Sequence, residues 1–254
     1  MNLVMQPEYA PGLVVLSFLI SAAGAFAALT ASSLIVGRNG RVQVLNALTA
    51  GIALGGIGVW SMHFIGMLAV NVDMGVSYSI PETLLSLVAA VAGSTAALWW
   101  VALRPSLPRV IGAGLLLGIG VVVMHYLGMY GMRFGGRFEW DLGTVAASVA
   151  IAVVAAVAAL WLAFVVRTVV ARVGASLAMA GTVCAMHYTG MAAATFICTT
   201  PNPQAFPAGP LLVNSLQMPV VVSIVAFGAV FVILVDQAFQ RLQVQPRAAA
   251  SSVR

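Results

Sequence analysis

The chain contains three histidines, and they are evenly spaced. His63, His125 and His187 lie 62 residues apart in a sequence of 254 residues. Each stands in the same string, M-H-[FY]-x-G-M, with one methionine directly before it and another four residues after it. Imidazole and thioether are neutral ligands that suit copper, above all Cu(I), better than calcium, magnesium or manganese. The pattern therefore predicts a metal site built from three equivalent copies.

Nine side chains form the predicted ligand set. On a helix the histidine and the methionine four residues later share a face, whereas the preceding methionine points about 100° away, toward a neighbouring helix. Cys184 stands three residues before His187 and is an accessory candidate, although Trp60 and Val122 occupy that position in the other copies. The predicted ligands are Met62, His63, Met67, Met124, His125, Met129, Met186, His187 and Met191.

The composition places these motifs in a membrane. Hydrophobic residues make up 62% of the chain and charged residues 7%, and the mean hydropathy is +1.07. A soluble domain carries about 25% charged residues, so the chain is predicted to be an integral membrane protein. It has no lysine, which excludes a phosphate-binding loop of the GxxxxGK[ST] type and a retinal Schiff base.

Seven apolar runs predict an all-α protein with seven transmembrane helices. Residues 1–237 are expected to form this membrane domain and 238–254 a short, disordered cytoplasmic tail. Cys184 and Cys198 are expected on one helix, and if it is continuous their backbones are about 21 Å apart, too far for a disulfide. The runs are Pro11–Val36, Val44–Val70, Thr83–Leu103, Val110–Met132, Leu142–Val166, Val173–Ile197 and Leu211–Val235.

The arginines predict the orientation and indicate a bilayer, not a nucleic acid, as the partner. Nine of them fall in alternate connections and in the tail, whereas the other connections hold two arginines together with five acids. The positive-inside rule then puts the N-terminus outside and the C-terminus in the cytoplasm. The nine are Arg38, Arg41, Arg104, Arg109, Arg167, Arg172, Arg241, Arg247 and Arg254.

A period of 62 residues holds two spans, so the sequence predicts three parallel helix pairs. Spans two and three, four and five, and six and seven form these pairs, and the first span is left over. Pairs of small residues four apart are expected to pack closely on neighbouring helices. They are Gly51 and Gly55, Gly114 and Gly118, and Gly174 and Ala178.

Several alternatives to a copper sensor remain open at this point. Methionine fills irregular gaps between helices, and a buried histidine can simply satisfy a hydrogen bond. Zinc would accept three histidines but gains little from thioethers, and haem iron can take histidine or a histidine–methionine pair. A copper transporter would use the same ligands, although the cytoplasmic halves of the motif helices carry glycine and aliphatic residues and no series of further ligands.

The triple motif on alternate helices of a seven-span bundle resembles the MHYT domain, a family of bacterial membrane sensors. The resemblance covers about Tyr9 to Gln237. It implies a non-enzymatic sensor of a diatomic gas (oxygen, carbon monoxide or nitric oxide), acting through copper held by the motif's methionine, histidine and tyrosine. On that basis Tyr126 and Tyr188 are accessory candidates, but the first copy has Phe64 at the equivalent position.

Family members often continue into a cyclic-di-GMP synthase or phosphodiesterase domain or a histidine kinase. No such domain follows Asp236 in this sequence, so signalling is expected to need a separate partner. The combined expectation is a copper-binding membrane sensor whose ligand binds near the outer leaflet and whose cytoplasmic loops or tail report the event.

Overall fold

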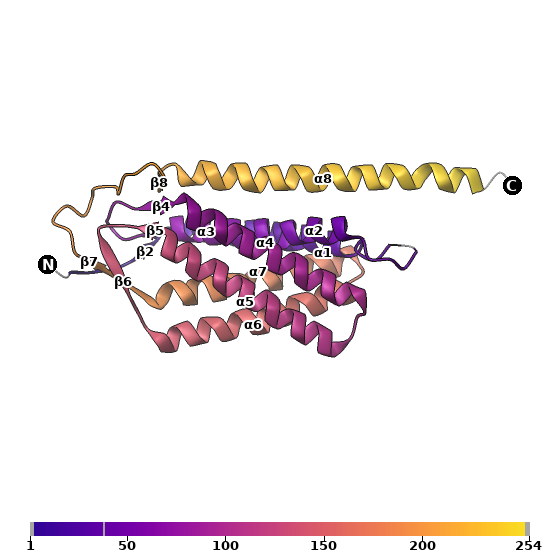
Figure 1. Ribbon diagram of the computed structural model, residues 1–254, viewed down its shortest axis with the longest axis horizontal. Coiled ribbons are helices and arrows are strands. Elements are labelled where there is room, and N and C mark those ends of the chain that lie inside the picture. Colours follow the sequence, from indigo (N-terminus) through magenta and orange to yellow (C-terminus); the bar gives the residue numbers. More distant parts are fainter. Residues whose placement is uncertain (1–2, 38, 252–254) are drawn as a thin grey trace.

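The computed structural model describes residues 3–37 and 39–251, which form a bundle of long helices with short strands at one end (Figure 1). Six helical stretches of this part are long and apolar enough to cross a membrane. The prediction of an all-α membrane protein is confirmed at this level. The six are α1 (Pro11–Ser32), the second helix (Val44–Leu68), α4 (Ile80–Leu103), α5 (Leu107–Gly131), α6 (Leu142–Val165) and α7 (Val169–Ala192).

The second helix is continuous but changes its winding. It consists of α2 (Val44–Gly51), the π-helix η1 (Ile52–Ser61) and α3 (Met62–Leu68). Its most apolar stretch is almost wholly buried. The Ser61 hydroxyl donates to the Gly56 carbonyl, five residues back, at 3.0 Å, which matches the π winding. Such windings are rare and often lie at functional sites; this one ends directly before the first motif.

The sixth span ends earlier than the sequence predicts. Helix α7 stops at Ala192, because Ala194–Cys198 form strand β7 between β1 (Leu3–Met5) and β6 (Gly136–Trp140). The expectation that both cysteines lie on one helix is therefore wrong. Cys184 is on α7 and Cys198 is on β7, and both are free thiols.

The seventh apolar run also differs from the prediction. Strand β8 (Leu212–Asn214) occupies its start, and helix α8 (Met218–Ser251) begins seven residues later than Leu211. The apolar part described for α8, Met218–Ile233, is shorter than the six spans. The helix continues past residue 237 to Ser251, so as far as Ser251 this segment is helical where a disordered tail was expected.

Antiparallel strands close the bundle at one end, and three of their pairs occupy equivalent positions. Strand β2 (Glu8–Tyr9) pairs with β3 (Val70–Asn71), β4 (Ser77–Ser79) with β5 (Met132–Arg133), and β6 with β7. In each pair one aromatic residue stands two positions before a helix, and the residue opposite it follows a motif helix. The partners are Tyr9 and Val70, Tyr78 and Met132, and Trp140 and Ala194, so the second members are 62 residues apart.

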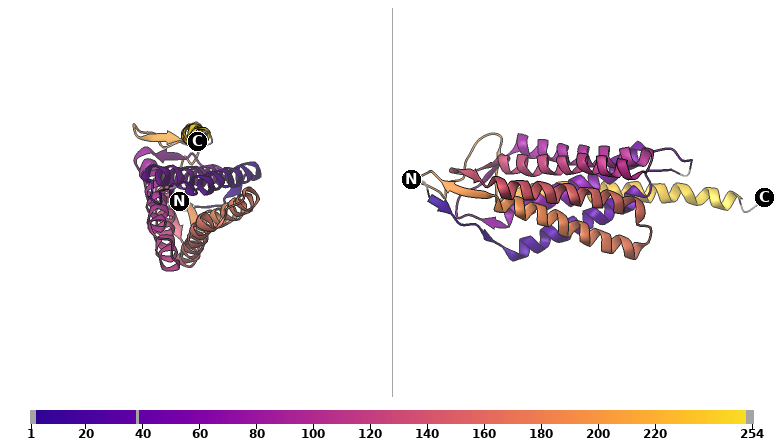
Figure 2. Two further views of the ribbon diagram at one scale, coloured as in Figure 1. Left: turned by 90° about the vertical axis from the view of Figure 1, so that its right-hand side faces the viewer. Right: turned by 90° about the horizontal axis from the view of Figure 1, so that it is seen from below.

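Three helices form the interior and three cover them. The second helix, α5 and α7 carry the motifs and meet in the middle, while α1, α4 and α6 each bridge two neighbouring inner helices. The end-on view in Figure 2 shows the resulting triangle, with α8 outside it. Helix α8 packs mainly on η1 and extends beyond the bundle at the end opposite the strands (Figure 1).

The packing of the first and the last helix differs from the prediction. The first helix, expected to be left over, occupies the third covering position between α7 and η1, and α8 is the extra helix. The strand pairs link a covering helix to an inner helix in the same way. Strand β2 precedes α1 and pairs with β3, which follows the second helix. Strand β4 precedes α4 and pairs with β5, which follows α5. The strand pairs thus join helices one and two, three and four, and five and six.

Close packing of glycines is confirmed for two of the three predicted pairs. A Cβ at Gly51 or Gly55 would collide with Thr95 or Ala90 of α4, and one at Gly114 or Gly118 with α6. The third pair, Gly174 and Ala178, is exposed on α7, and nothing lies within 4 Å of a Cβ at Gly174. That expectation is wrong because this face of α7 points out of the bundle.

Candidate metal centre

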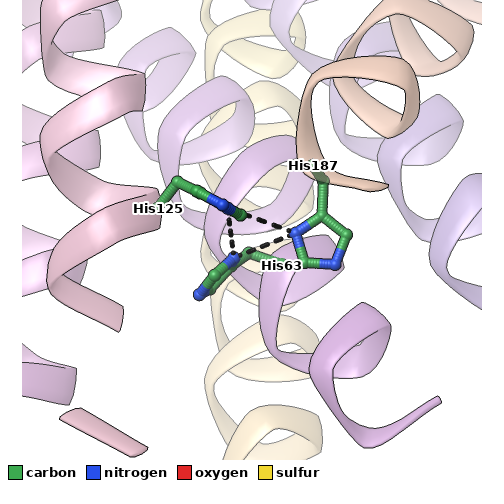
Figure 3. A group of neighbouring side chains, drawn as sticks. All are labelled: His63, His125 and His187. Carbon is green, nitrogen blue, oxygen red and sulfur yellow. Dashed lines mark hydrogen bonds between the residues drawn. The ribbon is translucent and has the colours of Figure 1, made fainter. Parts of the chain in front are cut away.

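The three histidines meet at the centre of the bundle (Figure 3). The Nδ1 atoms of His63 and His187 are 3.1 Å apart, those of His125 and His63 are 3.1 Å apart, and those of His187 and His125 are 3.4 Å apart. The three residues are 0–1% exposed. Among the residues described, they form the group of histidine, cysteine and acidic side chains whose atoms could hold a metal ion. We call this group the histidine triad.

The glycine of each motif makes room for the histidine of another. A Cβ at Gly128 would collide with Nε2 of His63, one at Gly190 with that of His125, and one at Gly66 with that of His187. Each imidazole therefore lies across the backbone of the next inner helix, and the order closes on itself around the bundle. The repeated string already contained this signal as its invariant G, but the sequence analysis assigned the glycines no role.

The triad cannot satisfy itself by hydrogen bonds alone. A neutral imidazole carries one proton, on Nδ1 or on Nε2. Each Nδ1 atom therefore either carries a proton or presents a lone pair, and among three such atoms at least two are in the same state. In at least one of the three contacts, two lone pairs or two N–H groups then face each other. If all three protons are on Nε2, three lone pairs point to one centre. A cation at that centre removes the conflict.

The size of the triangle suits a metal. Three atoms with these separations lie about 1.9 Å from their common centre, the separation divided by √3, close to the 2.0–2.1 Å of zinc–imidazole bonds. The space between the three Nδ1 atoms therefore has the size of a small metal ion bound by three nitrogens. The residues fit a metal with nitrogen ligands.

The six motif methionines are all buried, each with at most 2% of its surface exposed. They stand directly before and four residues after the histidines, on the same three inner helices. Their thioethers therefore belong to the apolar interior in which the triad lies. The residues are Met62, Met67, Met124, Met129, Met186 and Met191.

The two tyrosine hydroxyls are bonded to the covering helices. Tyr126 pairs with Ser148 of α6 at 2.6 Å, and Tyr188 pairs with Ser17 of α1 at 3.0 Å. In the first copy, which has Phe64 in place of a tyrosine, Trp60 makes the equivalent hydrogen bond: its indole N–H donates to Ser86 of α4 at 3.0 Å. The three serines each stand seventh in their helix and bond the carbonyl three residues back.

A second aromatic layer lies against the motifs on the strand side. Tyr78 contacts Phe64, Trp140 contacts Tyr126, and Tyr9 contacts Tyr188, with ring centroids 5.5–5.8 Å apart. The first ring in each contact precedes a covering helix, and the second belongs to a motif. Burial raises the pKa of Tyr9 and of Tyr78, so both phenols stay neutral in this layer.

Neither cysteine belongs to the histidine triad. Cys184 is half-buried beside Ser17 of α1, and its sulfur is not part of the clustered group. Cys198 contacts the carbonyl of Thr200 at 3.6 Å. The accessory role considered for Cys184 finds no support in this arrangement.

Fold and centre together define a class of protein: a multi-pass helical membrane protein with a buried histidine triad on an approximate threefold axis. The family model "MHYT: Bacterial signalling protein N terminal repeat" matches residues 56–114, 118–176 and 181–245. The chain therefore belongs to the MHYT family, as its motifs suggested.

The curated relatives that match are longer signalling proteins. The chain is 39% identical over 196 residues to the bifunctional diguanylate cyclase/cyclic di-GMP phosphodiesterase MucR of Pseudomonas aeruginosa, covering 74% of this chain and 28% of MucR. It is 34% identical to the cyclic di-GMP phosphodiesterase NbdA of the same organism (73% and 24%) and 32% identical to the signaling protein YkoW of Bacillus subtilis (74% and 24%). The chain thus spans about a quarter of their length. No solved structure matches it.

Proposed function

We propose that the triad binds copper as Cu(I) and that the chain is the membrane-embedded sensing part of a signalling system for a diatomic gas or for redox state. The observation that carries this proposal is the convergence of three Nδ1 atoms on one buried point. A monovalent ion held by neutral ligands costs less to bury than a divalent one. The six neighbouring thioethers favour copper over zinc.

The geometry argues against the two main alternatives. Nitrogens only 3.1–3.4 Å apart leave no room for a macrocycle between them, so haem is disfavoured. A transporter needs ligands along a path, but the described residues on the side of the triad away from the strands include the valines Val59, Val121 and Val183, one turn from each histidine. Copper is therefore proposed as a resident ion and not as cargo.

The chain's own residues would hold and shield this ion. His63, His125 and His187 offer Nδ1 lone pairs, and the facing glycine backbones fix the three rings by contact with their Nε2 edges. The buried methionines would keep water away from the triad and are the soft side chains nearest to its histidines in the sequence. Copper bound there would supply a position to which oxygen, carbon monoxide or nitric oxide can add. Ligand binding would then change the spacing of three helices.

Helix α8 is suited to pass such a change on. It packs on η1 and on α3, which carries His63, and it extends beyond the bundle at the end opposite the strands (Figure 1). The arginine-rich connections lie at that same end, so we propose that it faces the cytoplasm and that the protein lies in a bacterial inner membrane. The chain itself would catalyse no reaction and would act on a cytoplasmic signalling partner.

Elemental analysis tests the metal. We expect protein purified anaerobically and offered Cu(I) to retain about one copper per chain, and His125→Ala to retain none, because two imidazoles remain and a ligand is lost. Leu160→Ala is the matched control, since it removes a fully buried side chain of α6 and leaves the triad intact. If folded wild-type protein keeps no copper, the metal proposal is wrong. A Soret band would favour haem, and copper uptake into proteoliposomes would favour transport.

A further inference from the structure

A cavity of about 30 Å³ lies one helical turn from the triad, on the side away from the strands. Its lining includes Val59, Val121 and Val183, which stand four residues before His63, His125 and His187. These valines are 62 residues apart, one on each inner helix, and a turn corresponds to about 5.4 Å along the axis. The cavity reaches from these three valines toward α6, which adds Ala152, Ala155, Ala156 and Ala159 to the lining. We call it the valine cavity.

The chemistry of the lining is apolar. Leu117, Met179 and Met186 join the valines, and Met186 directly precedes His187. Of the lining residues only Thr182 carries a polar side chain. One water molecule needs roughly 10–15 Å³ and two or more polar partners, so the cavity has the space but not the partners. Apolar cavities of this kind stay dry and take up apolar guests such as xenon.

The cavity reaches the surface between α6 and α7. Ala155 of α6 and Thr182 of α7 both line it, the first half-buried and the second exposed. On the α5–α6 side, by contrast, Gly114 and Gly118 hold the helices in close contact. The seam between α6 and α7 would face the hydrocarbon core of the bilayer, in which small apolar gases dissolve better than in water.

We propose that the valine cavity is a binding and entry site for a small apolar gas. The gas enters from the bilayer between α6 and α7 and binds in the cavity, one helical turn from the triad. The proposal rests on the proposed gas-sensing function for its purpose, but the cavity itself can be tested without metal. The ligand class is a neutral diatomic molecule such as oxygen, carbon monoxide or nitric oxide.

Xenon binding followed by ¹²⁹Xe NMR tests the cavity in detergent-solubilised protein that has not been loaded with metal. We expect saturable binding to the wild type and its loss in Ala155→Phe, whose ring fills the cavity mouth. The matched control is Ala158→Phe, the same change at an exposed position of α6, and it should bind xenon normally. Absence of saturable binding to the wild type, or equal loss in both variants, would overturn the proposal.

Carbon monoxide recombination after flash photolysis of Cu(I)-loaded protein tests the route. Ala155→Phe should retain copper but rebind carbon monoxide about tenfold more slowly than Ala158→Phe, because the seam is blocked. If the two variants rebind carbon monoxide at equal rates while the wild type binds xenon, entry between α6 and α7 is wrong, but the valine cavity remains a binding site. A chain that binds xenon but no copper would contradict the proposed function and not the cavity, so the two failures are distinguishable.

Discussion

The triad and the aromatic layer around it differ in how strictly they repeat. At the centre each unit supplies the same histidine, and each histidine lies across the same glycine of the next helix. In the surrounding layer the residues change. Ser148 and Ser17 bind tyrosines, whereas Ser86 binds the indole of Trp60.

The difference shows what each region requires. Three side chains that share one point must be alike, because a longer or shorter group in one unit would displace the other two. A covering helix needs only one buried hydrogen bond to a motif helix, and a phenol or an indole placed one turn away provides it equally well. Phe64 is tolerated in the first unit because Trp60 binds the serine there.

The sharpest way to break the symmetric centre is to remove a glycine. In Gly190→Ala the new methyl group would overlap Nε2 of His125, which must turn away from the common point. We expect copper retention to fall by about 100-fold and unfolding to become easier by about 1–3 kcal/mol. Elemental analysis and thermal unfolding in detergent measure the two effects.

The control lies on the same helix. Nothing stands within 4 Å of a Cβ at Gly181, so Gly181→Ala should retain copper and unfold no earlier than the wild type. Gly66→Ala and Gly128→Ala should behave like Gly190→Ala, since the three sites are equivalent. An effect confined to one of them would show that the centre is not threefold.

A smaller loss of stability is expected when the aromatic layer of the first unit is made identical to that of the other two. Phe64→Tyr gives the first unit the tyrosine of the other two, but Trp60 already occupies the serine of α4, and Phe64 is fully buried beside Tyr78. The new hydroxyl lacks a partner at this position and should cost about 1–3 kcal/mol. Adding Trp60→Phe to Phe64→Tyr frees the Ser86 hydroxyl for the new phenol and should recover part of the loss. Thermal unfolding decides, and no recovery would contradict the shared role of Ser86.

The sequence predicted the centre better than the frame that holds it. Three histidines at equal spacing are enough to require a common depth, and the structure brings their Nδ1 atoms together. The role of Gly66, Gly128 and Gly190 could also have been recognised, because a glycine that recurs one turn after a buried histidine leaves space for a ring. Six of the spans follow from hydropathy alone.

The grouping of the helices could not be obtained from the period. A spacing of 62 residues fixes the length of a unit but not its starting point, and the sequence repeats begin within the second helix whereas the structural units begin at α1. The missing signal was short-range. Tyr9, Tyr78 and Trp140 each stand two residues before a helix, and Ser17, Ser86 and Ser148 each stand seventh within it. These patterns mark α1, not α8, as the third covering helix.

The same contrast predicts the smallest effect for the tyrosines. The hydroxyls of Tyr126 and Tyr188 bond to Ser148 and Ser17 on the covering helices, so they have partners other than a metal. Tyr126→Phe combined with Tyr188→Phe should therefore keep its copper and lose about 1 kcal/mol of stability for each hydrogen bond. Ser148→Ala should lower the unfolding temperature to a similar extent, whereas Ser94→Ala, at a buried hydroxyl with no partner, should not. Loss of copper in the double tyrosine variant would show instead that the phenols turn inward and act as ligands, and the division between a strict centre and a variable layer would then fail.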